Sequence, residues 1–196
     1  KNETNSNSSH TISGIAQGNY PVTVFDTWGC SAMGSVDVVT PAPIVIDIIS
    51  TTDASCNGVC DGSATIAVSG GTGSLDINWS GGNNPNATTN TGLCGQNYTV
   101  TVTDDNGCTA SESVSIDEPN AMSLLLSSTE SHCNQADGTA SVVVSGGVPP
   151  YDYLWSGGTQ PTSADNTGLD ATGSPYFVTV TDDNGCQEVG SVDITD

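Results

Sequence analysis

Basic residues are almost absent from this sequence of 196 residues: one Lys or Arg stands against 22 Asp and Glu, a formal net charge of −21. Such a surface repels nucleic acid phosphates and anionic lipid head groups, so we expect no nucleic acid partner. It attracts cations, above all calcium, which binds carboxylate and carbonyl oxygens. The competing interpretation of the acidic excess is solubility in a salty environment. The only basic residue is Lys1, so trypsin-like proteases have almost nothing to cut, as suits an extracellular protein.

Long apolar runs are also missing. No stretch approaches the ~20 apolar residues that cross a bilayer, so we expect no membrane insertion. The polar opening segment, residues 1–10, has no signal-peptide pattern. We therefore expect that processing removed the start, or that the sequence is a window of a longer protein. Helix-forming Lys, Arg and Glu are scarce, whereas Gly, Ser, Thr, Asn and Asp are abundant, which is typical of strands and turns.

The residues that most enzymes need are scarce. The only histidines are His10 and His132, and neither comes with a nucleophile and an orienting acid, so a catalytic triad is not expected. The Gly-rich segment 69–73 lacks the Lys and the helix of a phosphate-binding loop. Aromatic residues make up only 5%, too few to assemble a stacking platform for sugars easily. We predict that the protein is not an enzyme and uses no cofactor, calcium excepted.

What is present is a repeat. Three segments beginning at Tyr20, Tyr98 and Tyr176 align without gaps, and both spacings are 78 residues (98 − 20 and 176 − 98). The upstream halves of the last two also match, for example Trp79-Ser80-Gly81-Gly82 with Trp155-Ser156-Gly157-Gly158. A period of this length indicates an array of similar units. The expected domains are the C-terminal part of a first repeat (1–40), a second repeat (41–118) and a third (119–196).

Each repeat contains short strands. Polar and apolar residues alternate in 63–68, 75–79 and 98–103, and 44–49 and 113–116 add two further strands. Asp104-Asp105-Asn106-Gly107 reads as a tight hairpin turn between the last two. The predicted fold class is all-β, with tandem immunoglobulin-like β-sandwich repeats of about 78 residues. Trp79 and Trp155 are expected in the structural core of their repeats.

The recurring pattern resembles a known family. Asp-Gly-Ser-Ala, Ser-Gly-Gly, Trp-Ser, Tyr-x-Val-Thr-Val-Thr-Asp, Asn-Gly-Cys and a closing Pro are similar to the SprB-type repeat of large surface adhesins of gliding bacteria. The resemblance implies secretion to the cell surface, a long repetitive stalk, and a role in adhesion or gliding motility. The first repeat departs from the pattern at 25–29, which places Trp28 on a hairpin tip, where it could pack on a neighbouring domain or partner.

Comparison of the repeats sorts the seven cysteines. Cys60 and Cys94 occur only in the middle repeat and are absent together from the last, so we predict that they bond to each other. The link would close a loop of 94 − 60 = 34 residues and stabilise a small domain by roughly 3–4 kcal/mol. Cysteine usage of this kind favours an oxidising, extracellular location over zinc binding.

The recurring cysteines allow two pairings. A bond between Cys56 and Cys108 would lie inside one repeat, but a strand of five to seven residues, about 17–23 Å, separates their expected positions. In an end-to-end array the hairpin of one domain meets the opposite end of the domain before it. Cys56 would then face Cys186 of the next repeat, and we favour this inter-repeat pairing. Cys30, Cys108 and Cys133 would then bond to repeats beyond the fragment or to its missing first half. The intra-repeat alternative leaves only Cys30 unpaired.

The hinge between repeats is short, and its carboxylates suggest a metal site. Asp117 and Glu118 are expected near Asp182 and Asp183 on the hairpin of the following domain, where four carboxylates could bind calcium and stiffen the junction. The alternative is that all four are solvated turn residues.

We therefore expect a structural segment, the stalk or filament shaft of a secreted cell-surface adhesin that serves gliding motility or attachment. Its partners would be neighbouring repeats of the same chain, with lateral self-association or surface glycans as further candidates. The alternative function is a glycan- or protein-binding immunoglobulin-like module, in which loop 81–89 or the tip at Trp28 holds the ligand.

Overall fold

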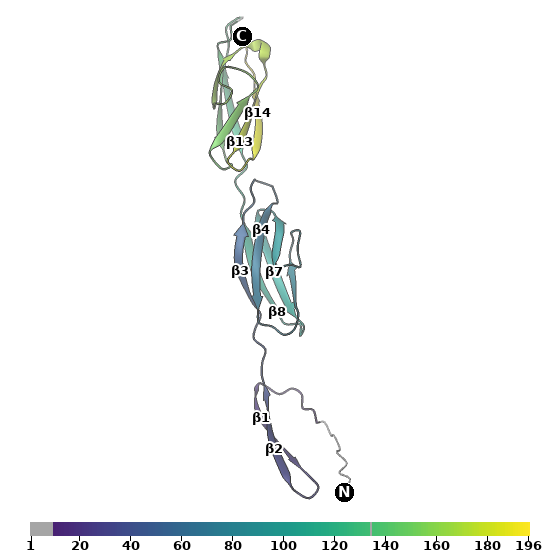
Figure 1. Cartoon of the computed structure of the whole chain (residues 1–196). Helices are drawn as coiled ribbons and strands as arrows, with labels where there is room; N and C mark the ends of the chain where they lie inside the picture. The colour runs from purple at the N-terminus through teal and green to yellow at the C-terminus, as the bar shows by residue number, and fades with distance from the viewer. Residues whose placement is uncertain (1–9, 134) are drawn as a thin grey trace.

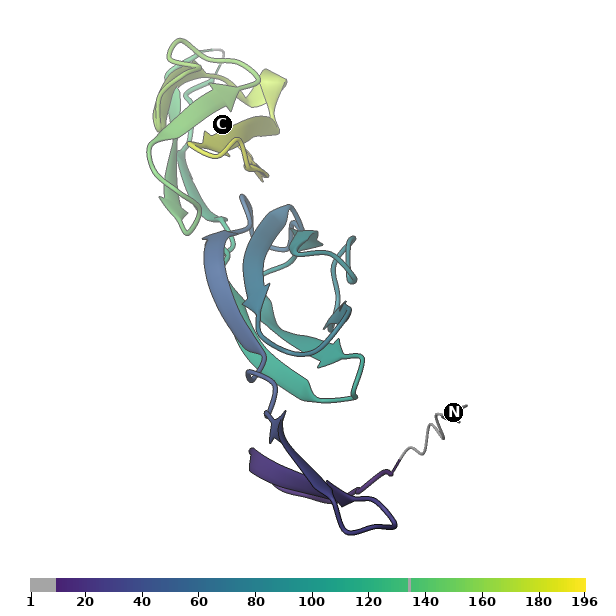
Figure 2. The same cartoon turned by 60° about the horizontal axis from the view of Figure 1, so that its bottom comes forward.

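The computed structural model describes residues 10–133 and 135–196, so residues 1–9 of the expected first repeat lie outside it. The described chain consists of strands and one short 3-10 helix, which confirms the all-β class. A hairpin and two larger modules follow one another in chain order along the molecule, and both views agree on this end-to-end arrangement (Figures 1 and 2). No helix in the described part is long and apolar enough to cross a membrane.

The hairpin at the N-terminal side pairs β1 (Gly18–Phe25) with β2 (Ser31–Val38). It corresponds to the last two strands of each module and keeps their alternating apolar pattern. Within the described residues no other strand pairs with it. Val22 and Val24 are therefore 44% and 63% exposed, whereas Val100 at the position corresponding to Val22 is fully buried.

The middle module contains two three-stranded antiparallel sheets, ordered β3-β4-β6 and β5-β7-β8. Short loops join consecutive strands, and the chain crosses between the sheets after β4, β5 and β6. The six strands are β3 (Val45–Thr52), β4 (Gly62–Ser69), β5 (Leu75–Trp79), β6 (Thr89–Leu93), β7 (Gln96–Asp104) and β8 (Thr109–Ile116).

The C-terminal module repeats this architecture, with sheets ordered β12-β10-β9 and β11-β13-β14. Its burial patterns match those of the middle module strand by strand in β10, β11 and β12. The elements are β9 (Ser123–Thr129), β10 (Gly138–Ser145), β11 (Tyr151–Trp155), β12 (Asp165–Leu169), the 3-10 helix η1 (Ala171–Gly173), β13 (Tyr176–Asp182) and β14 (Gln187–Val192).

Each module buries one apolar cluster between its two sheets, which is the packing of a β-sandwich. In the middle module, Ile66 of one sheet and Val100 of the other belong to the same cluster. Trp79 and Trp155 lie in these cores, each 3% exposed. The indole N–H of Trp79 donates to the Ala87 carbonyl at 2.9 Å, so its one polar atom is satisfied inside the core.

A buried amide holds the loop that follows the tryptophan. Asn90, fully buried in β6, accepts from the backbone N–H of Asn84 at 2.9 Å and donates to the Gly81 carbonyl at 2.6 Å. Gly82 has φ +91°, and a Cβ there would lie 2.4 Å from the Asn90 amide oxygen. Asn166 makes the same contacts in the C-terminal module, so this loop is anchored in the same way twice.

Candidate functional site: the junction between the modules

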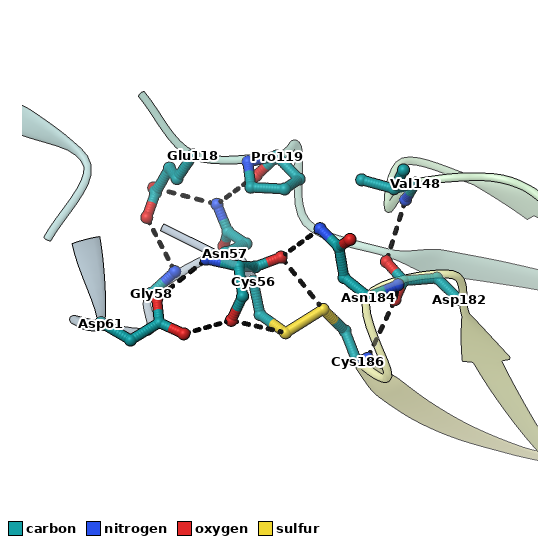
Figure 3. The surroundings of a disulfide bond; sticks show 11 residues. Cys56, Asn57, Gly58, Asp61, Glu118, Pro119, Val148, Asp182, Asn184 and Cys186 are labelled. Carbon is teal, nitrogen blue, oxygen red and sulfur yellow. Dashed lines mark hydrogen bonds between the residues drawn. A yellow bond between two sulfur atoms is a disulfide. The ribbon is translucent and has the colours of Figure 1, made fainter. Parts of the chain in front are cut away.

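A disulfide joins the two modules. Cys56, in the loop between β3 and β4, is bonded to Cys186, in the hairpin between β13 and β14 (Figure 3). Their Cα atoms lie 5.8 Å apart although 130 positions separate them in the sequence. This is the inter-repeat pairing favoured from the sequence. The intra-repeat alternative is wrong here, because Cys108 is free and exposed.

The loop that carries Cys56 is held by a carboxylate. Asp61 accepts from the backbone N–H of Ser55 at 2.8 Å and from its hydroxyl at 2.6 Å. The hydroxyl bond and the backbone bond from Ser55 hold the pKa of Asp61 below its ordinary value. The adjoining Ala54 N–H donates to the Asp117 carbonyl at 2.9 Å, which ties the loop to the end of β8. Cys56 is therefore presented from a loop bonded to its own module.

The hairpin that carries Cys186 is held in the same manner. One oxygen of the buried Asp182 carboxylate accepts from the backbone N–H groups of Asn184 at 3.0 Å and Cys186 at 2.9 Å. Its other oxygen accepts from Val148 N–H at 2.9 Å. Asp104 makes the equivalent bonds in the middle module, and those from Cys108 foremost hold the pKa of Asp104 below its ordinary value.

Hydrogen bonds accompany the disulfide across the junction. The Asn184 side chain donates to the Ser55 carbonyl at 2.8 Å, beside the sulfur atoms (Figure 3). On the linker side, Glu118 accepts from the Gly58 N–H at 2.8 Å and from the Asn57 side chain at 3.0 Å. Asn57 also donates to the Pro119 carbonyl at 3.1 Å. The loop 55–58 is thus fixed both to the linker behind it and to the following module.

A cleft of about 300 Å³ lies beside this disulfide. Apolar Val59 and Met122 and polar Gln187 and Glu188 are among the residues that line it. The Asp182 carboxylate also borders it but is occupied by three backbone N–H groups. The cleft is therefore a gap between two packed loops, with its buried polar group already satisfied.

The four carboxylates expected to bind calcium are not gathered. Among the described residues no three His, Cys, Asp or Glu side chains form a group that could hold a metal ion. Glu118 instead binds the loop 57–58, and Asp182 binds its own hairpin. Asp117 and Asp183 take part mainly through their backbones, with Asp183 N–H donating to the Val148 carbonyl at 2.9 Å. The expected cluster of Asp117, Glu118, Asp182 and Asp183 is therefore wrong for the described chain, because the carboxylate oxygens of Glu118 and Asp182 accept from nearby N–H groups and the four side chains form no common group.

Two segments of the chain, residues 48–84 and 126–160, match the family model of the SprB repeat. The chain carries SprB repeats. The two matches begin and end at corresponding positions of the two modules: they begin inside β3 and β9 and end within the loops anchored by Asn90 and Asn166. SprB repeats occur in cell-surface adhesins, where they are structural or adhesion modules.

No curated protein matches the sequence. Among solved structures the chain is similar to one titled "Crystal structure of Dpr2 Ig1-Ig2 in complex with DIP-Theta Ig1-Ig3". The identity is 14% over 91% of this chain and 72% of that chain, with a TM-score of 0.36.

A second disulfide joins Cys60 to Cys94 inside the middle SprB repeat, with a Cα–Cα distance of 3.9 Å. The C-terminal repeat has Ala136 and Asp170 at these positions. There Asp170 caps η1, accepting from the Thr172 hydroxyl at 2.7 Å and the Gly173 N–H at 2.9 Å. The first of these bonds is the largest cause that lowers the pKa of Asp170. A capped helical turn thus occupies the place where the middle repeat has a covalent bond.

The remaining predicted positions are exposed. Trp28 lies at the tip between β1 and β2 and is 88% exposed. The ring of His132 contacts the Asp137 carboxylate at 2.7 Å. Hydrogen bonds from His132, first that of the His132 backbone N–H, hold the pKa of Asp137 below its ordinary value. This pair occupies the place of Ser55 and Asp61 in the other repeat, so the histidine belongs to a turn. Cys30, Cys108 and Cys133 are free and exposed.

Proposed function

We propose that this chain is a segment of the extracellular shaft of a cell-surface adhesin, in which each SprB repeat is bonded covalently to the next. The observation that carries the proposal is the Cys56–Cys186 disulfide across the junction. A bond between neighbouring repeats restricts their relative movement, which a shaft requires and a set of independent binding modules does not. A disulfide also persists in the oxidising environment outside a cell.

The free cysteines support continuation of the same linkage. Cys133 occupies the position of Cys56 in the C-terminal repeat, and Cys108 and Cys30 occupy the position of Cys186 in the preceding hairpins. All three are exposed, in the loops and hairpins that a neighbouring repeat would contact. We infer that they bond to flanking repeats of the native adhesin, and that the shaft serves attachment or gliding motility.

The acidic surface supports a location outside the cell. With a net charge of −21, neighbouring shafts repel one another at low ionic strength and remain dispersed. Lys1 is the only basic residue, so proteases that cut after Lys or Arg find almost no site. Both properties suit a long exposed protein that must persist on a surface.

The test is disulfide mapping of natively secreted protein under non-reducing conditions. Pepsin at low pH suits the chain, because it needs no basic residue and acid suppresses thiol exchange. Because Cys56 and Cys60 lie close together on one peptide, fragmentation of the backbone between them must distinguish the two disulfides. A Cys186→Ser variant provides the matched control. We expect a Cys56–Cys186 linkage in the secreted protein, together with labelling of unpermeabilised cells by an antibody to the repeat. A Cys56–Cys108 linkage, or a protein retained inside the cell, would overturn the proposal.

A second function has one observation in its favour, the apolar tip of the β1–β2 hairpin. Phe25, Trp28 and Met33 are 68%, 88% and 81% exposed, and an exposed aromatic tip is a common binding feature. Screening the chain against a glycan array, with Trp28→Ser as control, distinguishes the two functions. Retention that depends on Trp28 would favour a binding module.

A further inference from the structure

We propose that the Cys56–Cys186 disulfide has a mechanical function: it carries tensile load past the two SprB repeats, so that both stay folded while the chain is under tension. This inference rests on the proposed function as a shaft, because only a shaft is pulled from its two ends. It concerns the route of the force through the molecule rather than the stiffness of one junction.

The covalent route from one end to the other is short. It follows β3 to Cys56, crosses the disulfide to Cys186, and continues along β14 toward Asp196. The intervening residues 57–185 lie on a closed loop whose ends are 130 positions apart in the sequence. Tension applied at the two ends reaches Cys186 without passing through this loop. Strands β4 to β13 therefore carry no load while the bond is intact.

The loaded segments are already extended in the folded protein. β3 (Val45–Thr52) and β14 (Gln187–Val192) are strands, and β3 and β14 lie along the length of their modules in Figure 1. A strand rises about 3.3 Å per residue, whereas the fully stretched chain reaches at most about 3.6 Å per residue. Pulling therefore lengthens these segments by only about a tenth. The bonded junction behaves as an almost inextensible connection.

Without the bond, the force takes a different route. It would enter the middle module at β3 and leave it at β8, and these strands belong to different sheets. Tension would then separate the two sheets and expose the core that Trp79 and Val100 share. Unfolding the whole loop would release 130 positions, which at about 3.6 Å each is about 470 Å of chain.

The inner disulfide makes the released length diagnostic. Cys60 and Cys94 lie within the loop and are separated by 34 positions. If only the junction bond is lost, 130 − 34 = 96 positions are released, about 350 Å. If both bonds are lost, about 470 Å is released. The two lengths report which disulfide restrains the chain.

The test is single-molecule force spectroscopy on the full chain, held at its two ends. In the oxidised protein we expect no step longer than the opening of the β1–β2 hairpin, whose paired ends Gly18 and Val38 enclose 38 − 18 = 20 positions, about 70 Å. Cys186→Ser should add about 350 Å, and the wild-type protein with a reductant about 470 Å. Cys108→Ser, which removes a free exposed thiol, is the matched control and should behave as wild type.

A reductant added while the oxidised chain is held under constant force shows whether the modules remained folded. Folded modules should unfold in separate steps after the bond is cut. A single release of 350 Å or more at the moment of reduction would mean that they had already unfolded, and would overturn the inference. If the chain shows this single release but is exposed on the cell surface, the proposed function as a shaft stays intact. A chain that resists force but is absent from the cell surface would overturn the proposed function alone.

Discussion

Replacing both Cys60 and Cys94 by serine should destabilise the middle SprB repeat by about 3–4 kcal/mol and leave the C-terminal repeat unchanged. The bond closes a loop of 34 positions, and the chain-entropy model assigns such a loop about 3.8 kcal/mol. The effect acts mainly on the unfolded chain, which gains freedom when the link is removed. The C-terminal repeat never had this bond, so it serves as an internal control.

Amide hydrogen exchange measured by mass spectrometry resolves the two repeats. Val100 of β7 and Val178 of β13 are both fully buried, so their amides exchange when the whole module opens. A loss of 3–4 kcal/mol should speed exchange at Val100 by two to three powers of ten, because each factor of ten is worth about 1.4 kcal/mol. Exchange at Val178 should stay within a few-fold of wild type.

The control variant for this measurement is Cys108→Ser, which also removes a thiol from the middle module but breaks no bond. Its effect should stay within about 0.5 kcal/mol, as is usual at an exposed position. An increase of less than tenfold at Val100 in the double variant would refute the reasoning. So would an equal increase at Val178, because the loss would then not be confined to the loop closed by the bond.

Three further predictions concern the carboxylates and the buried amide. Asp104 has a lowered pKa in the folded state, so its contribution to stability is present above the ordinary pKa of about 3.9 and is lost as the pH falls through the folded value. The variant Asp104→Asn should therefore lower the denaturation midpoint at pH 7 and have a smaller effect on it at pH 2. Asn166→Leu should cost about 3 kcal/mol or more in thermal unfolding of the C-terminal repeat, because the backbone groups of Gly157, Gln160 and Thr167 lose their hydrogen bonds to this fully buried side chain. An unchanged melting temperature would contradict this. Adding calcium should raise the melting temperature no more than adding magnesium does, because no group of carboxylates is available at the junction in the described chain; a rise specific to calcium that EDTA reverses would disprove this.

Much of the fold could be predicted from local patterns. Alternation of apolar and polar residues located β5 at its observed bounds and most of β7, because a strand with one buried face leaves this period in the sequence. The strand β6 (Thr89–Leu93) was not predicted. It has one apolar residue, Leu93, and its other fully buried side chain is the polar Asn90. Only the loop contacts that Asn90 makes explain why it lies inside.

The sequence was also enough to suggest the disulfide partners but not to predict what the carboxylates bind. Comparison of repeats suggested the partners of Cys56 and Cys60, because bonded cysteines appear in the sequence as a pair and strand lengths limit their separation. The same reasoning failed for Glu118 and Asp182. Whether a carboxylate binds a metal or a backbone N–H depends on which groups lie within about 3 Å, and the sequence does not contain those distances.

The sequence by itself determined the repeat, most of its β-strands and the positions of the cysteines, since all three follow from residue type and spacing along the chain. The tertiary structure alone decided what the junction does. It brought Cys56 and Cys186 together across 130 positions and placed β3 and β14 as the segments between them and the chain ends. The route of force through a folded chain depends on which distant residues are in contact, and such contacts exist only after the chain has folded.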